Sequence, residues 1–595
     1  MKIHPGLFLS FLFLIAFPSW GEEVYPRPEW KETRDSIASP AASPGGEISI
    51  YGGDQPQSLN YLLDNNVFSW NVWVLLYEPL VNSDSLTLEP VPQIAEKWAI
   101  SDDKKTFTFW INPQARWSDG QPITAEDVKW TFDTIMDPKN LTGVQKSSLQ
   151  GFESPTILGP LQIQFRAKEV HWRNFLEVGI LRVLPRHAFE GKDFNRINFE
   201  FPVVSGPYRI EKIDPGIMIT LQRRSDYWRN SAPSLQGMYN FERLKFRMYG
   251  DPNNALDAFL KGEIDFFAET TAEQWIKRAV GEKFDKNWIV KQKVYNHQPI
   301  GVRGFAMNMR RAPFDDARVR RAMALCLNRE FMNKTLAYDQ YALQRSYYED
   351  LYSAETPCPN ELIPFDKEQA RRLLAEAGWK ANPNTGVLEK EGKPFSFEFL
   401  SRSPIEAKYL NVYQADLKEV GVEMRIAQKD FAAWLKDVTR FNFEMTLVNW
   451  NAVVLPWKDP RAQWHSSEAK REAGNNLVGF MNEEVDRIVD GYKTLFDLKD
   501  RLEACRKIDR IAVKETPYAL LWYVNHARLL YWNKFGTPPT VCDKYDDGKM
   551  AWVYWWLDED SKADLTDAMS TGNALPVRKA EIRFDQEFRP AGGGQ

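Results

Sequence analysis

The side chains that most often carry enzyme chemistry are scattered along this chain rather than grouped. Acidic pairs such as Asp102-Asp103 and Asp315-Asp316 stand in contexts typical of turns and helix N-caps. No nucleophile elbow, phosphate-binding loop, H-E-x-x-H zinc motif or G-x-G-x-x-G motif occurs. The sequence therefore supports neither an enzyme nor a metal site, and it predicts no cofactor. The histidines that follow the N-terminal segment stand singly at His171, His187, His297, His465 and His526.

Aromatic side chains are the abundant chemical resource. The 595 residues include 22 Trp, 22 Tyr and 36 Phe, and such rings suit both packed cores and ligand sites. Acidic residues number 81 and basic residues 76, for a net charge of -5. This balance excludes general nucleic-acid binding, which needs a basic surface. We expect the run of arginines between 310 and 329 to be the solvated face of a helix.

The N-terminus has the pattern of a secretory signal. Lys2 precedes an apolar run over 7–17, and Pro18 ends it. Small residues at Ser19 and Gly21 predict cleavage before Glu22. The run is too short to span a bilayer comfortably, and no cysteine near the cleavage site allows lipid attachment. We therefore expect an exported protein that is not a lipoprotein.

Export would permit disulfides, but the sequence does not assign any. Four cysteines allow three complete pairings, and buried thiols remain an alternative to bridges. The cysteines are Cys326, Cys358, Cys505 and Cys542.

Strand and helix patterns alternate along the rest of the chain and predict a mixed α/β fold. Residues 22–46 are rich in proline and predict an extended leader that is not packed. Thr124 predicts a helix N-cap with Asp127 at the capping-box distance, and glycines 262 and 378 predict helix ends. The predicted strands are 47–51, 106–111, 161–167 and 217–222. The predicted helices are 124–132, 254–261, 315–327, 367–377, 483–494 and 497–513.

A series of local phrases, in order, resembles the peptide-type (family 5) substrate-binding proteins of ABC importers. They cover nearly the whole chain after the signal, and the phrase that begins at Ala115 is the most specific. The phrases are Tyr77-Glu-Pro-Leu-Val81, Pro92-Gln-Ile-Ala-Glu-Lys-Trp98, Ala115-Arg-Trp-Ser-Asp-Gly-Gln-Pro-Ile-Thr-Ala-Glu-Asp-Val128, Ser205-Gly-Pro-Tyr208, Asp226-Tyr-Trp228, Gly262-Glu-Ile-Asp265, Pro313-Phe-Asp-Asp-Ala-Arg-Val-Arg320 and Leu373-Leu-Ala-Glu-Ala-Gly-Trp379.

Within that family the chain is most similar to the Yej-type periplasmic oligopeptide-binding proteins. Four further phrases carry this finer resemblance. They are Tyr239-Asn-Phe-Glu242, Gly281-Glu-Lys-Phe-Asp-Lys-Asn-Trp-Ile-Val290, Tyr531-Trp-Asn-Lys-Phe535 and Trp552-Val-Tyr-Trp-Trp556.

The resemblance implies a two-lobed periplasmic-binding-protein fold of type II, with the extra N-terminal subdomain of cluster C. The ligand would lie between the lobes and be enclosed by hinge closure. The first lobe would comprise 47–303 and 526–595, with the extra subdomain near 80–200, and the second lobe 304–525. The implied partners are an oligopeptide or peptide-like ligand, an inner-membrane ABC permease and its ATPase subunits. The protein itself would be a monomer in the periplasm.

The resemblance also places the ligand-binding residues, with Trp450 as the leading candidate. In the family a peptide binds in extended form, like an added strand. The candidates are Asn65, Asn66, Phe68, Trp70, Phe431, Trp434, Asn449, Trp450 and Asn451.

One position departs from the family pattern. Peptide binders often carry an Asp three residues after the Trp of this phrase, where it pairs with the amine of the ligand. Here that residue is Val453, and the nearest acid is Asp459. We therefore expect no such amine anchor. Another acid would substitute, or the ligand end would be modified, or longer peptides would protrude.

Two alternatives remain open. The same fold binds other solutes, such as an oligosaccharide, a nickel or other metal chelate, haem or an opine, and the tryptophan content keeps a sugar in consideration. A secreted hydrolase would need a nucleophile or a carboxylate pair, which we do not find.

Overall fold

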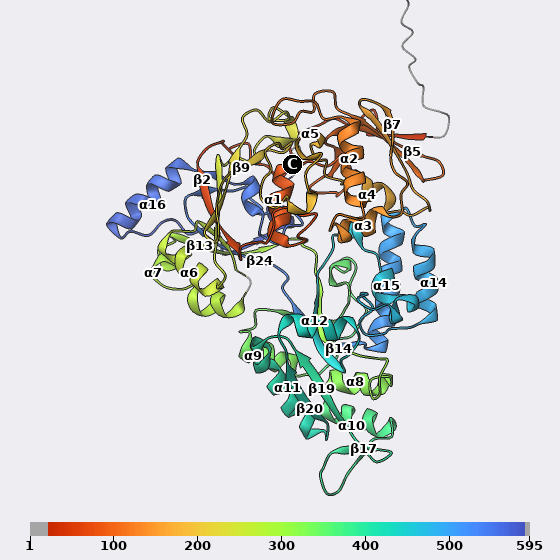
Figure 1. Ribbon diagram of the computed structural model, residues 1–595. Coiled ribbons are helices and arrows are strands. Elements are labelled where there is room, and N and C mark those ends of the chain that lie inside the picture. The colour runs from red at the N-terminus through yellow and green to blue at the C-terminus, as the bar shows by residue number, and fades with distance from the viewer. Residues whose placement is uncertain (1–21, 270, 590–595) are drawn as a thin grey trace, which may run out of the picture.

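A computed structural model gives the fold of residues 22–269 and 271–589 (Figure 1). The predicted signal peptide lies outside the described residues. Figure 1 shows two large bodies, one above the other, and each contains a large sheet at its centre. We call them the first and second lobes. None of the described helices is long and apolar enough to cross a membrane.

An eight-stranded sheet forms the centre of the first lobe. Residues Ile48 and Ile50 alternate with polar residues and are buried, because one face of their strand meets the core. β2 pairs in parallel with β11, and β13 pairs antiparallel with β24. In order across the sheet the strands are β27 (Glu581–Arg583), β13 (Ile289–Tyr295), β24 (Ala527–Trp532), β12 (Phe266–Ala268), β2 (Glu47–Gly53), β11 (Arg243–Met248), β10 (Met218–Arg223) and β9 (Tyr208–Asp214).

A second, five-stranded sheet is built mainly from residues 95–166, with β1 from the leader at one edge. Its strands in order are β1 (Glu22–Tyr25), β5 (Ala95–Ser101), β6 (Thr106–Ile111), β8 (Gln162–Arg166) and β7 (Thr156–Gly159). The helices of the first lobe are α1 (Val67–Leu76), α2 (Ala125–Met136), α3 (Gly143–Leu149), α4 (Asn174–Gly179), α5 (Arg186–Phe189), α6 (Pro252–Lys261), α7 (Glu282–Asp285), α16 (Glu559–Thr571) and α17 (Phe584–Glu587).

The second lobe has a five-stranded sheet covered by helices. Its strands in order are β20 (Glu423–Gln428), β19 (Ser396–Ser401), β21 (Met445–Trp450), β14 (Val302–Met307) and β22 (Tyr518–Leu520). Its helices are α8 (Ala317–Leu325), α9 (Arg329–Leu336), α10 (Lys367–Glu376), α11 (Ala407–Glu419), α12 (Phe431–Thr439), α13 (Arg461–Trp464), α14 (Glu483–Tyr492) and α15 (Leu498–Glu515). Short paired strands complete the fold: β3 (Val81–Ser83), β4 (Pro90–Pro92), β15 (Ala342–Leu343), β16 (Lys380–Ala381), β17 (Leu388–Lys390), β18 (Lys393–Pro394), β23 (Trp522–Tyr523), β25 (Phe535–Gly536) and β26 (Trp556–Leu557).

The chain passes between the two lobe sheets twice. Residues 296–301 join β13 to β14, and residues 524–526 join β23 to β24. We propose that the two lobes divide at these segments. The predicted boundary between 303 and 304 falls inside β14, which pairs with β21 from Val302 onward.

The predicted helix ends follow from local chemistry. The Asp127 carboxylate accepts a hydrogen bond from the backbone N–H of Thr124 at 2.9 Å, as the capping-box interpretation requires. Asp316 caps α8 by accepting from the N–H of Arg318 at 2.9 Å. Gly262 and Gly378 adopt φ values of 86° and 91°, a conformation that favours glycine.

Two expectations from the sequence were wrong. The predicted leader packs against the first lobe: β1 pairs with β5, and Ile37 and Ala38 are buried. Proline limits regular structure after Tyr25 but does not prevent docking. The arginines of 310–329 are not all solvated, because Arg320 and Arg329 are only 1% and 4% exposed. Their guanidinium groups donate to backbone carbonyls such as those of Glu515 and Leu520.

Gly301 provides a test of the first crossing. A Cβ at this residue would lie 2.1 Å from the carbonyl oxygen of Trp450. We expect Gly301→Ala to lower the free energy of unfolding by about 1–3 kcal/mol, because backbone must move. Chemical denaturation measures this. The control Gly151→Ala meets open space and should cost less than about 0.5 kcal/mol. Equal stabilities for the two variants would contradict the close approach.

Candidate functional site

Large apolar side chains are exposed on the two ends of the lobes that face each other. On α1, Trp70 is 37% exposed and Val67 is also exposed. On α12, Phe431 is 57% exposed, and Leu435 follows it on the same face one turn later. Figure 1 shows α12 at the end of the second lobe nearest the first, with α1 above it. This clustered apolar exposure makes the facing ends of the lobes the candidate ligand site.

A hollow of about 220 Å³ lies beside Trp70 in the first lobe. The Tyr61 ring centroid lies 4.8 Å from that of Trp70, and the Arg182 guanidinium lies 5.1 Å from the same ring. Val144 and Ile180 add apolar lining. The hollow therefore offers aromatic and aliphatic surface with one cationic group at its wall.

Two polar atoms at this hollow have no hydrogen-bond partner among the described residues. They are Nε of Arg182 and Oε1 of Gln145. Burial lowers the pKa of Arg182 to about 10, which leaves its guanidinium positively charged at neutral pH. Both atoms are shielded from solvent, so a molecule in the hollow reaches them only if neighbouring side chains move, although buried polar groups normally have partners.

The four candidates at the start of α1 divide into two pairs. Asn65 and Trp70 are exposed. Asn66 caps the helix, since its Oδ1 accepts from the N–H of Ser69 at 2.8 Å. The half-buried Phe68 packs edge-on against Phe246 in the first-lobe core, with ring centroids 5.3 Å apart. Asn66 and Phe68 therefore hold the helix that presents Trp70.

The candidates on α12 are layered. Trp434 is only 6% exposed, and its Nε1 donates to Oγ1 of Thr446 at 2.9 Å. The Phe431 ring stacks on the Trp434 ring, with centroids 5.7 Å apart. The Arg402 guanidinium lies 4.7 Å from the centroid of the Trp434 ring. Trp434 is thus a platform, and Phe431 and Arg402 form the accessible layer above it.

The end of β21 carries the other three candidates. Asn449 and Asn451 are exposed, whereas Trp450 is half-buried. Nε1 of Trp450 donates to the hydroxyl of Tyr518 at 3.2 Å. Burial raises the pKa of Tyr518, so this hydroxyl stays protonated. Trp450 therefore has a packing role, and its predicted role in ligand binding stays a prediction.

Val453 is exposed, and the acid nearest to it in the sequence is engaged elsewhere. The Asp459 carboxylate lies 3.5 Å from Nη1 of Arg173, a first-lobe residue. Lys458 pairs with Asp350 at 2.9 Å and donates to the carbonyl of Val453. The charge of the lysine beside Val453 is thus balanced by Asp350.

Sequence reasoning missed Tyr61, Arg182 and Arg402. Arg182 is placed by an isolated antiparallel bridge to Pro79, a contact between segments about a hundred residues apart. Arg402 follows β19, and its position after a second-lobe strand was the one signal that pointed to it.

No group of histidine, cysteine and acidic residues suited to a metal ion occurs in 22–269 and 271–589. The four cysteines form no disulfide there. Burial raises the pKa of Cys326 and of Cys505 to about 12, so neither thiol is reactive at neutral pH.

Comparison with known proteins identifies the family of the chain. Residues 89–471 match the family model described as "Bacterial extracellular solute-binding proteins, family 5 Middle". The chain belongs to this family. Family 5 proteins are non-catalytic solute-binding proteins of ABC import that act outside the cytoplasmic membrane.

One curated relative of this family 5 protein matches nearly throughout. The uncharacterized protein YejA of Escherichia coli (strain K12) is 28% identical over 593 residues, which cover 94% of this chain and 96% of YejA.

Two solved structures share the fold. AppA of Bacillus subtilis in complex with a nonapeptide has a TM-score of 0.66 and 22% identity, over 87% of this chain and 99% of AppA. NikA of Brucella suis in complex with Fe(III)-EDTA has a TM-score of 0.69 and 21% identity, over 82% of this chain and 96% of NikA. The expected mixed α/β fold of cluster C is thereby confirmed.

Variants of Asn66 and Asn65 distinguish a role in helix capping from a role in ligand binding. We expect Asn66→Ala to lower the free energy of unfolding by about 1 kcal/mol, because α1 loses its N-cap. Thermal or chemical denaturation measures it. Asn65→Ala serves as the control and should leave stability unchanged; an equal loss there would show that the cap is not the cause.

Proposed function

We propose that this family 5 protein captures oligopeptides or peptide-like compounds in the periplasm and delivers them to an inner-membrane ABC permease with its ATPase subunits. The observation that carries the proposal is the pair of exposed apolar surfaces at Trp70 and Phe431 on facing ends of the two lobes. A ligand between them would bury both surfaces when the lobes close.

The polar groups support a peptide-like ligand. Arg182 places a positive charge at the wall of an apolar hollow, which suits a ligand that has both an apolar side chain and a carboxylate. The exposed amides of Asn449 and Asn451 can bind backbone groups without selecting a sequence. The nonapeptide in AppA fits the same interpretation.

A second candidate ligand is a metal chelate. The solved NikA structure holds Fe(III)-EDTA, and a chelate with carboxylates would suit Arg182 and Arg402. It would also be captured without any metal-ligating cluster in the protein, of which the described residues have none.

The co-purified ligand decides between them. We expect native mass spectrometry of protein isolated from the periplasm to show a mass excess that denaturation releases as a series of peptides. A single chelate or sugar in stoichiometric amount would contradict the peptide proposal. The same material shows by its intact mass whether cleavage occurs before Glu22.

Phe431 is the sharpest probe of the second-lobe surface. We expect Phe431→Ala to raise the Kd for released peptides by about tenfold, which corresponds to about 1.4 kcal/mol of lost apolar burial. Isothermal titration calorimetry measures it. Phe496→Ala is the matched control, because Phe496 is a similarly exposed phenylalanine of the second lobe outside the proposed site. An unchanged Kd for Phe431→Ala would remove α12 from the site.

A further inference from the structure

A tryptophan of the first lobe is buried in the core of the second. Trp172 lies in the loop between β8 and α4, yet it is only 5% exposed and belongs to a cluster otherwise built mainly from second-lobe residues. Its ring centroid lies 6.0 Å from that of Tyr492, and the Arg501 guanidinium lies 4.2 Å from its ring. Its backbone N–H donates to the carbonyl of Lys493 at 3.0 Å.

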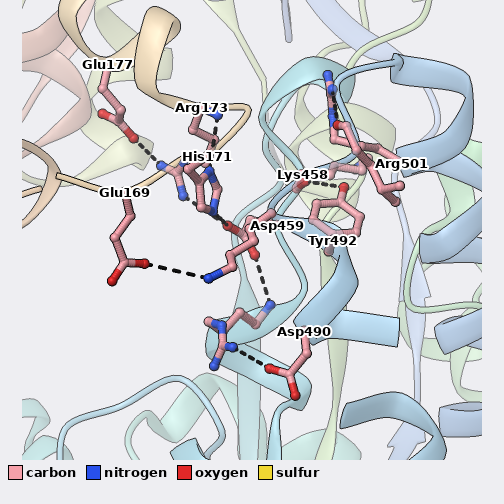
Figure 2. A network of polar contacts seen from close by, with 12 residues as sticks. Glu169, His171, Arg173, Glu177, Lys458, Asp459, Asp490, Tyr492 and Arg501 are labelled. Carbon is pink, nitrogen blue, oxygen red and sulfur yellow. Dashed lines mark hydrogen bonds and ion pairs between the residues drawn. The ribbon is translucent and has the colours of Figure 1, made fainter. Parts of the chain in front are cut away.

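Polar contacts surround this insertion (Figure 2). Arg173 and His171 both approach the Asp459 carboxylate, at 3.5 and 3.8 Å. Glu169 pairs with Lys493 at 3.6 Å. A hollow of about 460 Å³ adjoins these side chains on the first-lobe side. Because ion pairs that water can reach contribute little, the ring of Trp172 supplies most of the attraction.

Three buried donors at the contact are unsatisfied within the described part of the chain, as are a few in the lobe cores, such as Nε1 of Trp117 and Nε1 of Trp522. Nε1 of Trp172, Nε of Arg173 and Nε of Arg501 are buried and have no hydrogen-bond partner among the described residues. Each such donor costs free energy, and folded cores rarely keep several together. All three would regain water if the surfaces separated, which favours an interface that opens.

The contact lies away from the segments that join the lobes, so it can restrict how the lobes move. The lobes are joined covalently by 296–301 and 524–526, and near these segments by Arg528, which donates to the carbonyl of Gln340. Trp172 lies elsewhere, because its ring contacts Tyr492 at the end of α14 and Arg501 in α15. Figure 1 shows α4 of the first lobe near these two helices. In this same arrangement Phe431 and Trp70 are exposed. The insertion of Trp172 therefore coincides with uncovered ligand surfaces.

We propose that Trp172 is a latch that holds the lobes in the ligand-free arrangement and must be released before they close on a ligand. This inference rests on the proposed function. Since a ligand that binds the closed form must overcome the stability of the latch, weakening the latch increases ligand affinity without any contact to the ligand.

The test uses the full mature chain and two readouts. We expect Trp172→Ala to change the radius of gyration and broaden the distance distribution of the ligand-free protein in small-angle X-ray scattering. We also expect its Kd for the co-purified peptides to fall at least fivefold. Trp130→Ala is the matched control, because Trp130 stacks on Phe189 within the first lobe and should change neither quantity.

A second variant guards against misfolding of the first. Asp459→Asn removes the charge that faces Arg173 and His171 and should shift both readouts in the same direction by a smaller amount. The latch proposal would be overturned by unchanged scattering in both variants. It would also be overturned by a Kd that stays the same or rises. If no peptide binds even the unaltered protein, the proposed function fails, while the scattering of the ligand-free variants still decides whether Trp172 holds the lobes.

Discussion

The pairing of β13 with β24 and of β14 with β22 is the constraint on which the rest of the structure depends. The first crossing leaves β13 and enters β14, and the second leaves the β22–β23 segment and enters β24. In each sheet the two strands concerned are hydrogen-bonded neighbours. Both crossings therefore start and end side by side, which is the geometry of a hinge rather than of two separate tethers.

Adjacent crossings leave the facing ends of the lobes without a covalent constraint. Apolar side chains such as Trp70 and Phe431 can stay exposed there, because nothing in the backbone brings the two surfaces together. Buried partners fix the orientation of each surface from behind: Phe68 and Asn66 hold α1, and Trp434 supports α12. The proposed binding surfaces are thus each held from within their own lobe, and the joining segments allow one lobe to move relative to the other.

The tryptophans show how composition misleads about function. Their number kept a sugar ligand in consideration, because sugar faces stack on rings. Several tryptophans are instead fully buried in the cores, among them Trp73, Trp117, Trp552 and Trp555. Trp172 is buried by the opposite lobe. The aromatic content therefore reflects large cores and contacts between the lobes, and it carries little information about the ligand.

The sequence by itself determined what depends on neighbours along the chain. The capping of α2 by Thr124 and Asp127 and the helix ends at Gly262 and Gly378 are local hydrogen-bond and φ requirements, and the structure confirms them. The family phrases are local as well, and through them the fold was predicted. Only the tertiary structure decided that Arg182 lies against Trp70 and that the proline-rich leader packs against the first lobe. Such contacts join segments far apart in the chain, where hydrophobic burial and bridging hydrogen bonds select the partner and no spacing in the sequence records the choice.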